Sequence, residues 1–221
     1  FIGYPIKDYL TDYKKRIPQY DTSNLVTRQN IQVYEMKNKD FYVYDKAIVN
    51  NLEYELIERI YAQIDLLKEK YDKAVYLFRM DENMHRESIK SEKLKLHQYG
   101  NPIKKDGSPS DIYLSGFQPD FILFLEDNEN FHFQIFIEPK GMSGERYAKE
   151  LWKEELLNYI TTNSGEIVFA DDTSNVSIKG LKFYNLNDGQ ETVKQLKEIV
   201  GIEKDVTDIS NKASSLFDFE F

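Results

Sequence analysis

Three charged side chains, Asp120, Glu138 and Lys140, flank two apolar runs in the stretch GFQPDFILFLEDNENFHFQIFIEPKG, residues 116–141. Two carboxylates and an ammonium group at the end of a covered sheet must either pair with one another or bind a ligand. The carboxylates suit Mg²⁺, which is usually held by one or two carboxylates with water and substrate phosphate. Such a metal activates water and neutralises phosphate charge, and Lys140 could orient the attacking water. The alternative is a structural ion pair between Lys140 and one of the carboxylates.

The two apolar runs are predicted to form a hairpin that brings the carboxylates together. A turn centred on Glu129 places Asp120 opposite Glu138. The other pairs would be Phe121 with Ile137, Leu123 with Ile135, and Leu125 with Phe133. Because side chains alternate between the faces of a strand, Asp120 and Glu138 share one face, and Lys140 joins them if the strand stays extended. Both faces are largely apolar, which indicates a sheet covered on both sides.

The elements around this hairpin follow a mixed α/β order. Two β-rich runs joined by KNKD predict a second hairpin, with strands over residues 31–36 and 41–46. Apolar periodicity predicts helices over residues 49–70, 145–160 and 191–202. Asn50 or Asn51 is a suitable cap for the first of them. Further strands are predicted over residues 75–80, 166–170 and 176–186. We therefore expect an α/β fold with a mixed central β-sheet and helices on both faces.

Composition limits the class of protein. The 221 residues are 41% hydrophobic, enough for one domain with a sizeable core. The chain has no cysteine, which excludes disulfides, thiolate zinc sites and cysteine nucleophiles. The three histidines, His85, His97 and His132, are too isolated to predict a zinc site. No apolar run approaches the roughly 18 residues of a membrane span, so we expect no membrane partner and a cytoplasmic location.

Charge argues against a general nucleic-acid binder but leaves room for a local basic face. The net charge is −9, whereas phosphate contacts need Lys and Arg. Residues 86–105 nevertheless carry six basic and two acidic residues. The candidate DNA contacts within this segment are Lys93, Lys95, Lys104 and Lys105. The alternative is a solvated surface loop.

The pattern Pro119–Asp120, a strand, and then Glu138–Pro139–Lys140 resembles the signature of the PD-(D/E)xK nucleases. The extended form, FQPDFILFL followed by FQIFIEPKG, is similar to the endonuclease domain at the C-terminus of the Res subunit of type III restriction enzymes. The resemblance covers residues 46 to 186 and implies a restriction-endonuclease-like αβββαβ core. The expected organisation is an N-terminal β-hairpin extension over residues 1–45, a nuclease core over 46–190, and a C-terminal helix and tail over 191–221.

The resemblance implies Mg²⁺-dependent hydrolysis of DNA phosphodiesters, with Mn²⁺ as a possible substitute. Asp120 and Glu138 would hold the metal, Lys140 would position the water, and the Pro139 carbonyl would be a further ligand. Because proline lacks an N–H group, Pro139 is expected to end the ladder of the sheet and leave the backbone at an edge or bulge.

The same family often carries a glutamate on the first helix of its core. Glu53 is the best match, with Glu55 and Glu58 as rivals, and each could instead be a solvated helix charge. Two further side chains have two interpretations each. Trp152 could stack on a base or pack in the core, and Gln134, which shares the Glu138 face, could contact substrate or bond to a neighbour.

A whole Res subunit also contains an ATP-driven translocase. This sequence has no GxxxxGK[ST] motif and begins at Phe1 without Met, so we expect a fragment of a longer chain with the translocase upstream. The expected partners are double-stranded DNA, that translocase region, and a methyltransferase/specificity subunit.

Two other classes of function remain open. The first is a non-catalytic nuclease-like module that docks DNA or a partner subunit. The second is a carboxylate-pair hydrolase such as a glycosidase, with Asp120 and Glu138 as acid and nucleophile. Against the second, Lys140 is expected to hold both carboxylates ionised, which opposes the raised pKa that a general acid needs.

Overall fold

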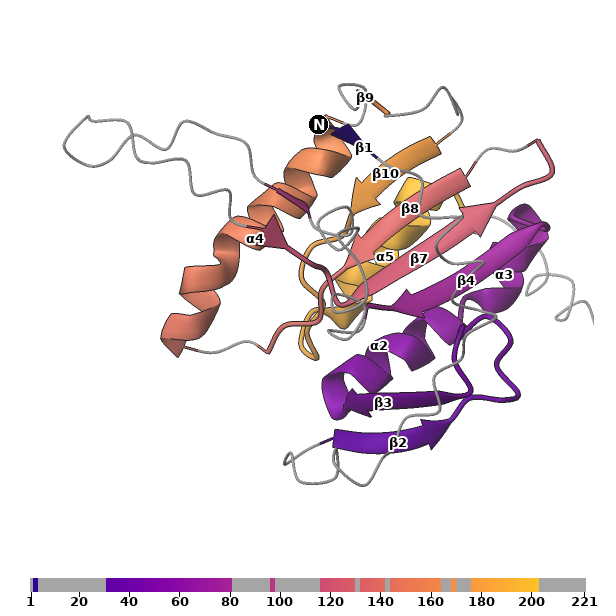
Figure 1. Cartoon of the computed structure of the whole chain (residues 1–221), viewed down its shortest axis with the longest axis horizontal. Coiled ribbons are helices and arrows are strands. Elements are labelled where there is room, and N and C mark those ends of the chain that lie inside the picture. Colours follow the sequence, from indigo (N-terminus) through magenta and orange to yellow (C-terminus); the bar gives the residue numbers. More distant parts are fainter. Residues whose placement is uncertain are drawn as a thin grey trace, which may run out of the picture.

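Figure 1 shows the computed structural model of the chain, which describes residues 2–3, 31–80, 96–97, 116–129, 132–141, 144–163, 168–169 and 176–202. The strands are β1 (Ile2–Gly3), β2 (Ile31–Glu35), β3 (Lys46–Asn50), β4 (Ala74–Arg79), β5 (Leu96–His97), β6 (Gly116–Phe117), β7 (Phe121–Glu126), β8 (His132–Ile137), β9 (Val168–Phe169) and β10 (Val176–Gly180). The helices are α2 (Asn51–Tyr61), α3 (Ile64–Lys70), α4 (Gly144–Thr162) and α5 (Gly189–Val200).

The centre of the fold is a mixed four-stranded sheet in the order β10-β8-β7-β4. β4 and β7 are antiparallel, β7 and β8 are antiparallel, and β8 and β10 are parallel with α4 between them in the chain. The predicted mixed α/β class is therefore confirmed.

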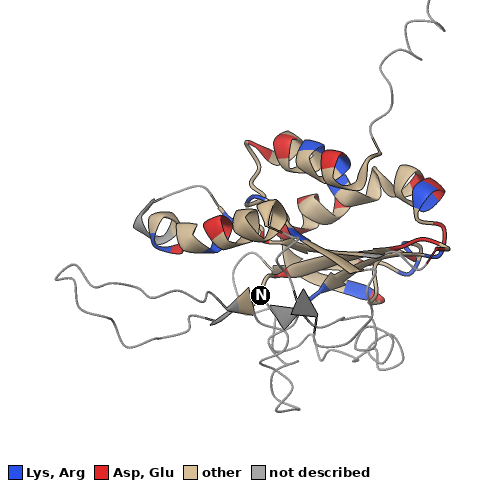
Figure 2. Ribbon diagram, turned by 90° about the horizontal axis from the view of Figure 1, so that it is seen from above, with Lys and Arg blue, Asp and Glu red and all other residues tan. Residues whose placement is uncertain are grey.

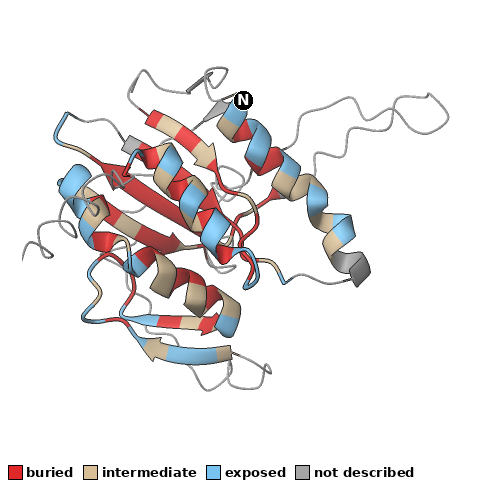
Figure 3. Cartoon of the chain, turned by 180° about the vertical axis from the view of Figure 1, so that it is seen from behind, coloured by how far each residue is buried: buried red, intermediate tan, exposed pale blue. Residues whose placement is uncertain are grey.

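The central hairpin has the predicted register. Phe121 lies opposite Ile137, Leu123 opposite Ile135, and Leu125 opposite Phe133. All six residues of β7 are buried, as Figure 3 shows for the strands in red, which explains a continuous apolar run in place of alternation. The one charge within β7, Glu126, is 2% exposed and forms an ion pair of 2.9 Å with Lys73.

Helix α4 covers one face of this sheet. A Cβ atom on Gly180 of β10 would lie 2.6 Å from the Leu157 carbonyl oxygen, so the helix backbone packs directly on that residue. Gly180 lies beside Phe136 in the register, and neighbouring residues in register point to the same face. The α4 face is therefore the one that carries Phe136 and, two residues on, Glu138.

Helix α5 and the end of α3 cover the opposite face. The ring of Tyr71, just after α3, packs edge-on against Phe133, which points away from the Phe136 side of β8. The Tyr71 hydroxyl donates a hydrogen bond of 2.9 Å to the carbonyl of Val200 at the end of α5. In Figure 1, α5 lies behind the strands. Helices on both faces, as predicted, explain why both faces are apolar.

The second hairpin differs from its prediction. β2 pairs with β3, residues Lys46–Asn50, which overlaps the predicted second strand, residues 41–46, only at Lys46. The run FYVY from Phe41 to Tyr44 is buried and lies beside β4 instead, with a parallel bridge between Tyr42 and Leu77. This run is apolar at every position, which suits burial against a central strand better than a half-exposed hairpin.

The predicted helix over residues 49–70 is divided into α2 and α3. Of the two candidate caps, the structure selects Asn50, whose side chain accepts a hydrogen bond from the Glu53 N–H group. Between the helices, the Gln63 N–H group donates to the Ile60 carbonyl over 2.9 Å, a tighter i to i+3 bond. Ile60 and Ile64 are both buried, so packing on either side of the break keeps the apolar stripe facing the core.

A single core cluster runs through the chain from Met36 to Ile202. Residues 36–44 and helix α5 therefore pack into the same core as the central strands. Charged side chains are carried mainly by the helices, while the strands are mostly apolar (Figure 2). Among the described helices, none combines the length and the apolar character that crossing a membrane requires.

Candidate active site

Asp120 and Glu138 meet at the end of the central hairpin, as predicted. Asp120 directly precedes β7, and Glu138 directly follows β8. The Asp120 N–H group donates a hydrogen bond of 3.0 Å to Oε2 of Glu138. Glu138 is only 4% exposed, whereas Asp120 is partly open to solvent. The fold thus brings together two carboxylates in a sheltered place.

Both carboxyl groups have a raised pKa. Burial raises the pKa of Asp120 to about 6, and the negative charge of Glu53 adds to it. Burial raises the pKa of Glu138 to about 7, and the charge of Asp120 adds to that. Lys140 lowers both pKa values without offsetting burial. Lys140 therefore does not prevent the raised pKa that a general acid needs, contrary to expectation, because desolvation exceeds its attraction.

Lys140 lies between two carboxylates. Its Nζ atom is 3.5 Å from Oε1 of Glu138 and also forms an ion pair with Glu150 of α4. Oε2 of Glu150 lies 3.4 Å from Nζ of Lys153, one helical turn further on. Sequence reasoning missed Glu150 and Lys153. Their signal was a carboxylate and a cation three residues apart on the helix that follows Lys140.

Glu53 is the helix glutamate that reaches the site. It is 7% exposed, and its charge is the largest electrostatic contribution that raises the pKa of Asp120. The two rivals have partners elsewhere, Glu55 with Arg59 and Glu58 with Lys39.

Glu53 also has a structural role that the sequence did not reveal. Its Oε2 atom accepts a hydrogen bond of 2.9 Å from the Asn50 N–H group, completing a capping box on α2. Its Oε1 atom lies 3.4 Å from the guanidinium of Arg79, at the end of β4. Arg79 lowers the pKa of Asp120 and is a second residue of the site that sequence reasoning missed.

The backbone of Glu138–Pro139–Lys140 is held by Tyr184. The Tyr184 N–H group donates to the Glu138 carbonyl over 2.9 Å, and the Lys140 N–H group donates to the Tyr184 carbonyl over 2.7 Å. Ladder bonding therefore continues past Pro139, contrary to expectation, because the parallel bridge uses only the groups that flank the proline. Backbone groups alternate in direction, so the Pro139 carbonyl is directed away from Tyr184, toward the Asp120 side.

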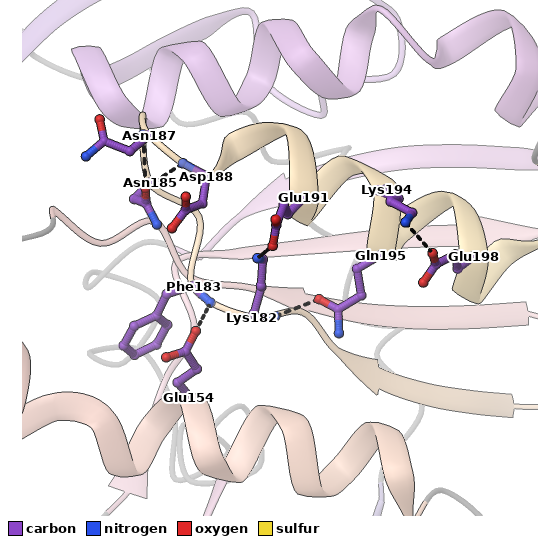
Figure 4. A network of polar contacts seen from close by, with 10 residues as sticks. All are labelled: Glu154, Lys182, Phe183, Asn185, Asn187, Asp188, Glu191, Lys194, Gln195 and Glu198. Carbon is purple, nitrogen blue, oxygen red and sulfur yellow. Dashed lines mark hydrogen bonds and ion pairs between the residues drawn. The ribbon is translucent and has the colours of Figure 1, made fainter.

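The segment that contains Tyr184 is itself anchored by side chains from two helices (Figure 4). Glu154 of α4 accepts a hydrogen bond of 2.8 Å from the Phe183 N–H group, and Gln195 of α5 accepts one of 2.9 Å from the Lys182 N–H group. The Tyr184 hydroxyl accepts a hydrogen bond of 2.8 Å from the Nε–H group of Arg59 in α2. Three helices therefore fix the strand that supports Glu138 and Lys140.

The remaining predicted residues do not join the site. Gln134 is fully buried, and its amide has no hydrogen-bond partner among the described residues, so the expected bond to a neighbour is not found there. Trp152 packs edge-on against Phe117, which favours packing. The basic candidates Lys93, Lys95, Lys104 and Lys105 lie outside the described residues.

The donor set suits a hard cation that keeps several waters. Two sheltered carboxylates with raised pKa values gain most from a positive charge between them, and the Pro139 carbonyl is directed to the same side. In the described ranges, no group of three or more His, Cys, Asp or Glu side chains is arranged to hold a metal. That donor set fits Mg²⁺, which needs only one or two carboxylates, better than a fully caged ion such as structural zinc.

Comparison with known proteins gives two matches. A family described as "HI_1054_C: C-terminal domain" matches residues 107–205, which include the central hairpin and α4. An uncharacterized protein of Haemophilus influenzae (strain ATCC 51907 / DSM 11121 / KW20 / Rd) is 31% identical over 188 residues, covering 80% of this chain and 33% of that protein. The chain thus spans about a third of the length of this relative. No solved structure matches the chain significantly.

Proposed function

We propose that this chain is a Mg²⁺-dependent DNA endonuclease domain that hydrolyses phosphodiester bonds. The observation that carries the proposal is the pairing of Asp120 with Glu138 at the end of a buried hairpin, beside Lys140. The αβββαβ order of elements supports it: α2 and α3, then β4, β7 and β8, then α4 and β10. The similarity to PD-(D/E)xK nucleases, and to the Res subunit of type III restriction enzymes, belongs to the same proposal.

In this proposal Asp120, Glu138 and the Pro139 carbonyl hold the divalent cation. When bound, Mg²⁺ or Mn²⁺ supplies positive charge that activates water and offsets the charge of the phosphate. Lys140, which lies beside Glu138, would position the attacking water or stabilise the phosphate oxygens. Glu53, whose charge raises the pKa of Asp120, would assist through a water or a second metal.

DNA delivery is assigned to other parts of a longer protein. The net charge of −9 predicts weak DNA binding by this chain alone. We propose that an ATP-dependent translocase region of the full-length chain and a methyltransferase/specificity subunit bring double-stranded DNA to the site. The lysines at 93, 95, 104 and 105 would contact the phosphates near the cut.

Plasmid nicking tests the proposal. Supercoiled DNA is incubated with excess protein and millimolar Mn²⁺ at pH 8, with wild type beside Asp120→Asn. We expect slow, non-specific nicking that is indifferent to ATP and lost in Asp120→Asn. Equal nicking by both proteins, or none by either, counts against the proposal.

Two further measurements, a DNA gel shift and a test of metal dependence, separate the alternatives. A docking module would shift DNA on a gel at low salt without cutting it. A carboxylate-pair hydrolase would act on its substrate without a divalent cation, and the raised pKa of Glu138 leaves that class open until metal dependence is measured.

A further inference from the structure

Helix α4 directs a carboxylate and a cation toward the proposed metal site. Glu150 pairs with Lys140, and its Oε2 atom is 3.4 Å from Nζ of Lys153. The side chains of Lys140, Glu150 and Lys153 are 18%, 19% and 21% exposed. Charges sheltered to this extent interact more strongly than pairs on an open surface.

The Lys140 ammonium group can therefore pair with either of two carboxylates, Glu138 or Glu150. Its Nζ atom is closer to Glu150 than to Glu138, from which it stands 3.5 Å away. An ammonium group that paired closely with Glu138 would occupy the oxygens that a divalent cation needs. The contact with Glu150 keeps that competition weak.

The Glu150 carboxylate stays charged and can therefore hold the Lys140 ammonium group. Burial opposes its ionisation, but the hydrogen bond from Lys140 lowers the pKa of Glu150 below its ordinary value, so the group stays charged. Lys153 holds it from the other side and in turn lies over the ring of Phe117, 5.2 Å from the ring centre. Both contacts restrict the direction in which the carboxylate points.

We propose that Glu150 is a positioning residue that holds the Lys140 ammonium group on the α4 side of the site, leaving Glu138 available to a divalent cation. This inference rests on the proposed function. Glu150 itself contacts neither metal nor substrate and acts only through Lys140.

A double-mutant cycle on metal affinity tests the inference. Mn²⁺ is titrated by calorimetry at pH 8 into wild type, Glu150→Gln, Lys140→Gln and the double variant. We expect Glu150→Gln to weaken Mn²⁺ binding by roughly two- to fivefold, the range of a competing ion pair. In the Lys140→Gln background the same change should have no effect, since no ammonium group remains to compete.

Two controls make the outcome specific. Glu155→Gln removes an exposed carboxylate from the same helix and should leave Mn²⁺ binding unchanged. Glu150→Asp keeps the charge but shortens the side chain, so this variant should weaken Mn²⁺ binding by less than Glu150→Gln. If Glu150→Gln does not fold, Glu150→Asp takes its place in the cycle.

The results distinguish this inference from the proposed function. If Glu150→Gln weakens Mn²⁺ binding equally in both backgrounds, or not at all, Glu150 does not act through Lys140, while the metal site stands. If wild type binds no Mn²⁺, the metal site and the positioning role both fail.

Discussion

The Asp120 N–H group donates a 3.0 Å hydrogen bond to Oε2 of Glu138, the carboxylate that faces it across the hairpin. This bond holds the Glu138 side chain beside the Asp120 carboxylate in spite of their repulsion. Burial and this repulsion raise the pKa of Glu138 to about 7. The protein therefore maintains an arrangement that is unfavourable without a cation, as expected of a site organised for binding rather than for stability.

Neutral replacements of the carboxylates should stabilise the metal-free protein. A carboxyl group whose pKa is higher in the folded than in the unfolded state makes stability fall as pH rises from about 4 to about 7. Glu138→Gln and Asp120→Asn remove that loss. We expect the melting temperature at pH 8 to rise by about 2–4 °C for each kcal/mol recovered, with little gain at pH 4.

Thermal unfolding at the two pH values measures this effect, with Glu155→Gln as the control for an ordinary exposed carboxylate. Both variants should also lose metal binding and cleavage. Variants that unfold at pH 8 would show that the charges hold the structure together and that the ion-pair interpretation is right.

Divalent-metal affinity should depend steeply on pH. A metal ligand must be deprotonated, and Asp120 and Glu138 have pKa values of about 6 and about 7. We expect Mn²⁺ binding to strengthen as pH rises from 5.5 to 7.5, level off above it, and release protons below pH 7. Calorimetry in two buffers of different ionisation enthalpy counts those protons. Affinity independent of pH over this range would contradict the carboxylate assignment.

Two variants of Glu53 should separate its structural role from its electrostatic role. Glu53→Ala removes the acceptor for the Asn50 N–H group and should cost about 1 kcal/mol of helix stability. Glu53→Gln can keep that hydrogen bond while removing the charge, so stability should stay close to wild type and the pKa of Asp120 should fall. Denaturant unfolding and NMR titration of the Asp120 carboxyl group measure the two effects. An unchanged Asp120 titration in Glu53→Gln would remove Glu53 from the site.

The contact between β10 and α4 should leave no room for a side chain at Gly180. A Cβ atom at Gly180 would lie 2.6 Å from the Leu157 carbonyl oxygen, so Gly180→Ala should cost about 1–3 kcal/mol and shift α4 with Glu150. At Gly141 a Cβ atom would meet nothing within 4 Å, so Gly141→Ala is the matched control and should be nearly neutral. Chemical denaturation compares them, and equal stability of the two variants would contradict the packing of α4.

Much of the central fold could be predicted from the pattern of apolar residues. The runs FILFL and FHFQIFI are apolar on both faces, so only one register places Asp120 and Glu138 together on a covered sheet, and that register is found. The second hairpin was predicted wrongly because β propensity identified Phe41–Tyr44 as a strand without showing that its neighbour is Leu77, far along the chain. Local sequence does not encode such long-range pairing.

The site was predictable on the hairpin and, through the family resemblance, at Glu53 of α2, but not where β4 and α4 contribute. Arg79, Glu150 and Lys153 are ordinary surface-type residues in sequence, and only the packing of β4 and α4 brings their charges near Asp120. The raised carboxyl pKa values could not be foreseen either, because burial depends on every element around the site.

A Mn²⁺ titration by calorimetry at pH 8, on wild type and Asp120→Ala, tests the central claim most directly. We expect millimolar binding to wild type and its loss in Asp120→Ala, because the proposed cation would lie between Asp120 and Glu138. An isotherm that is the same in both proteins would contradict it.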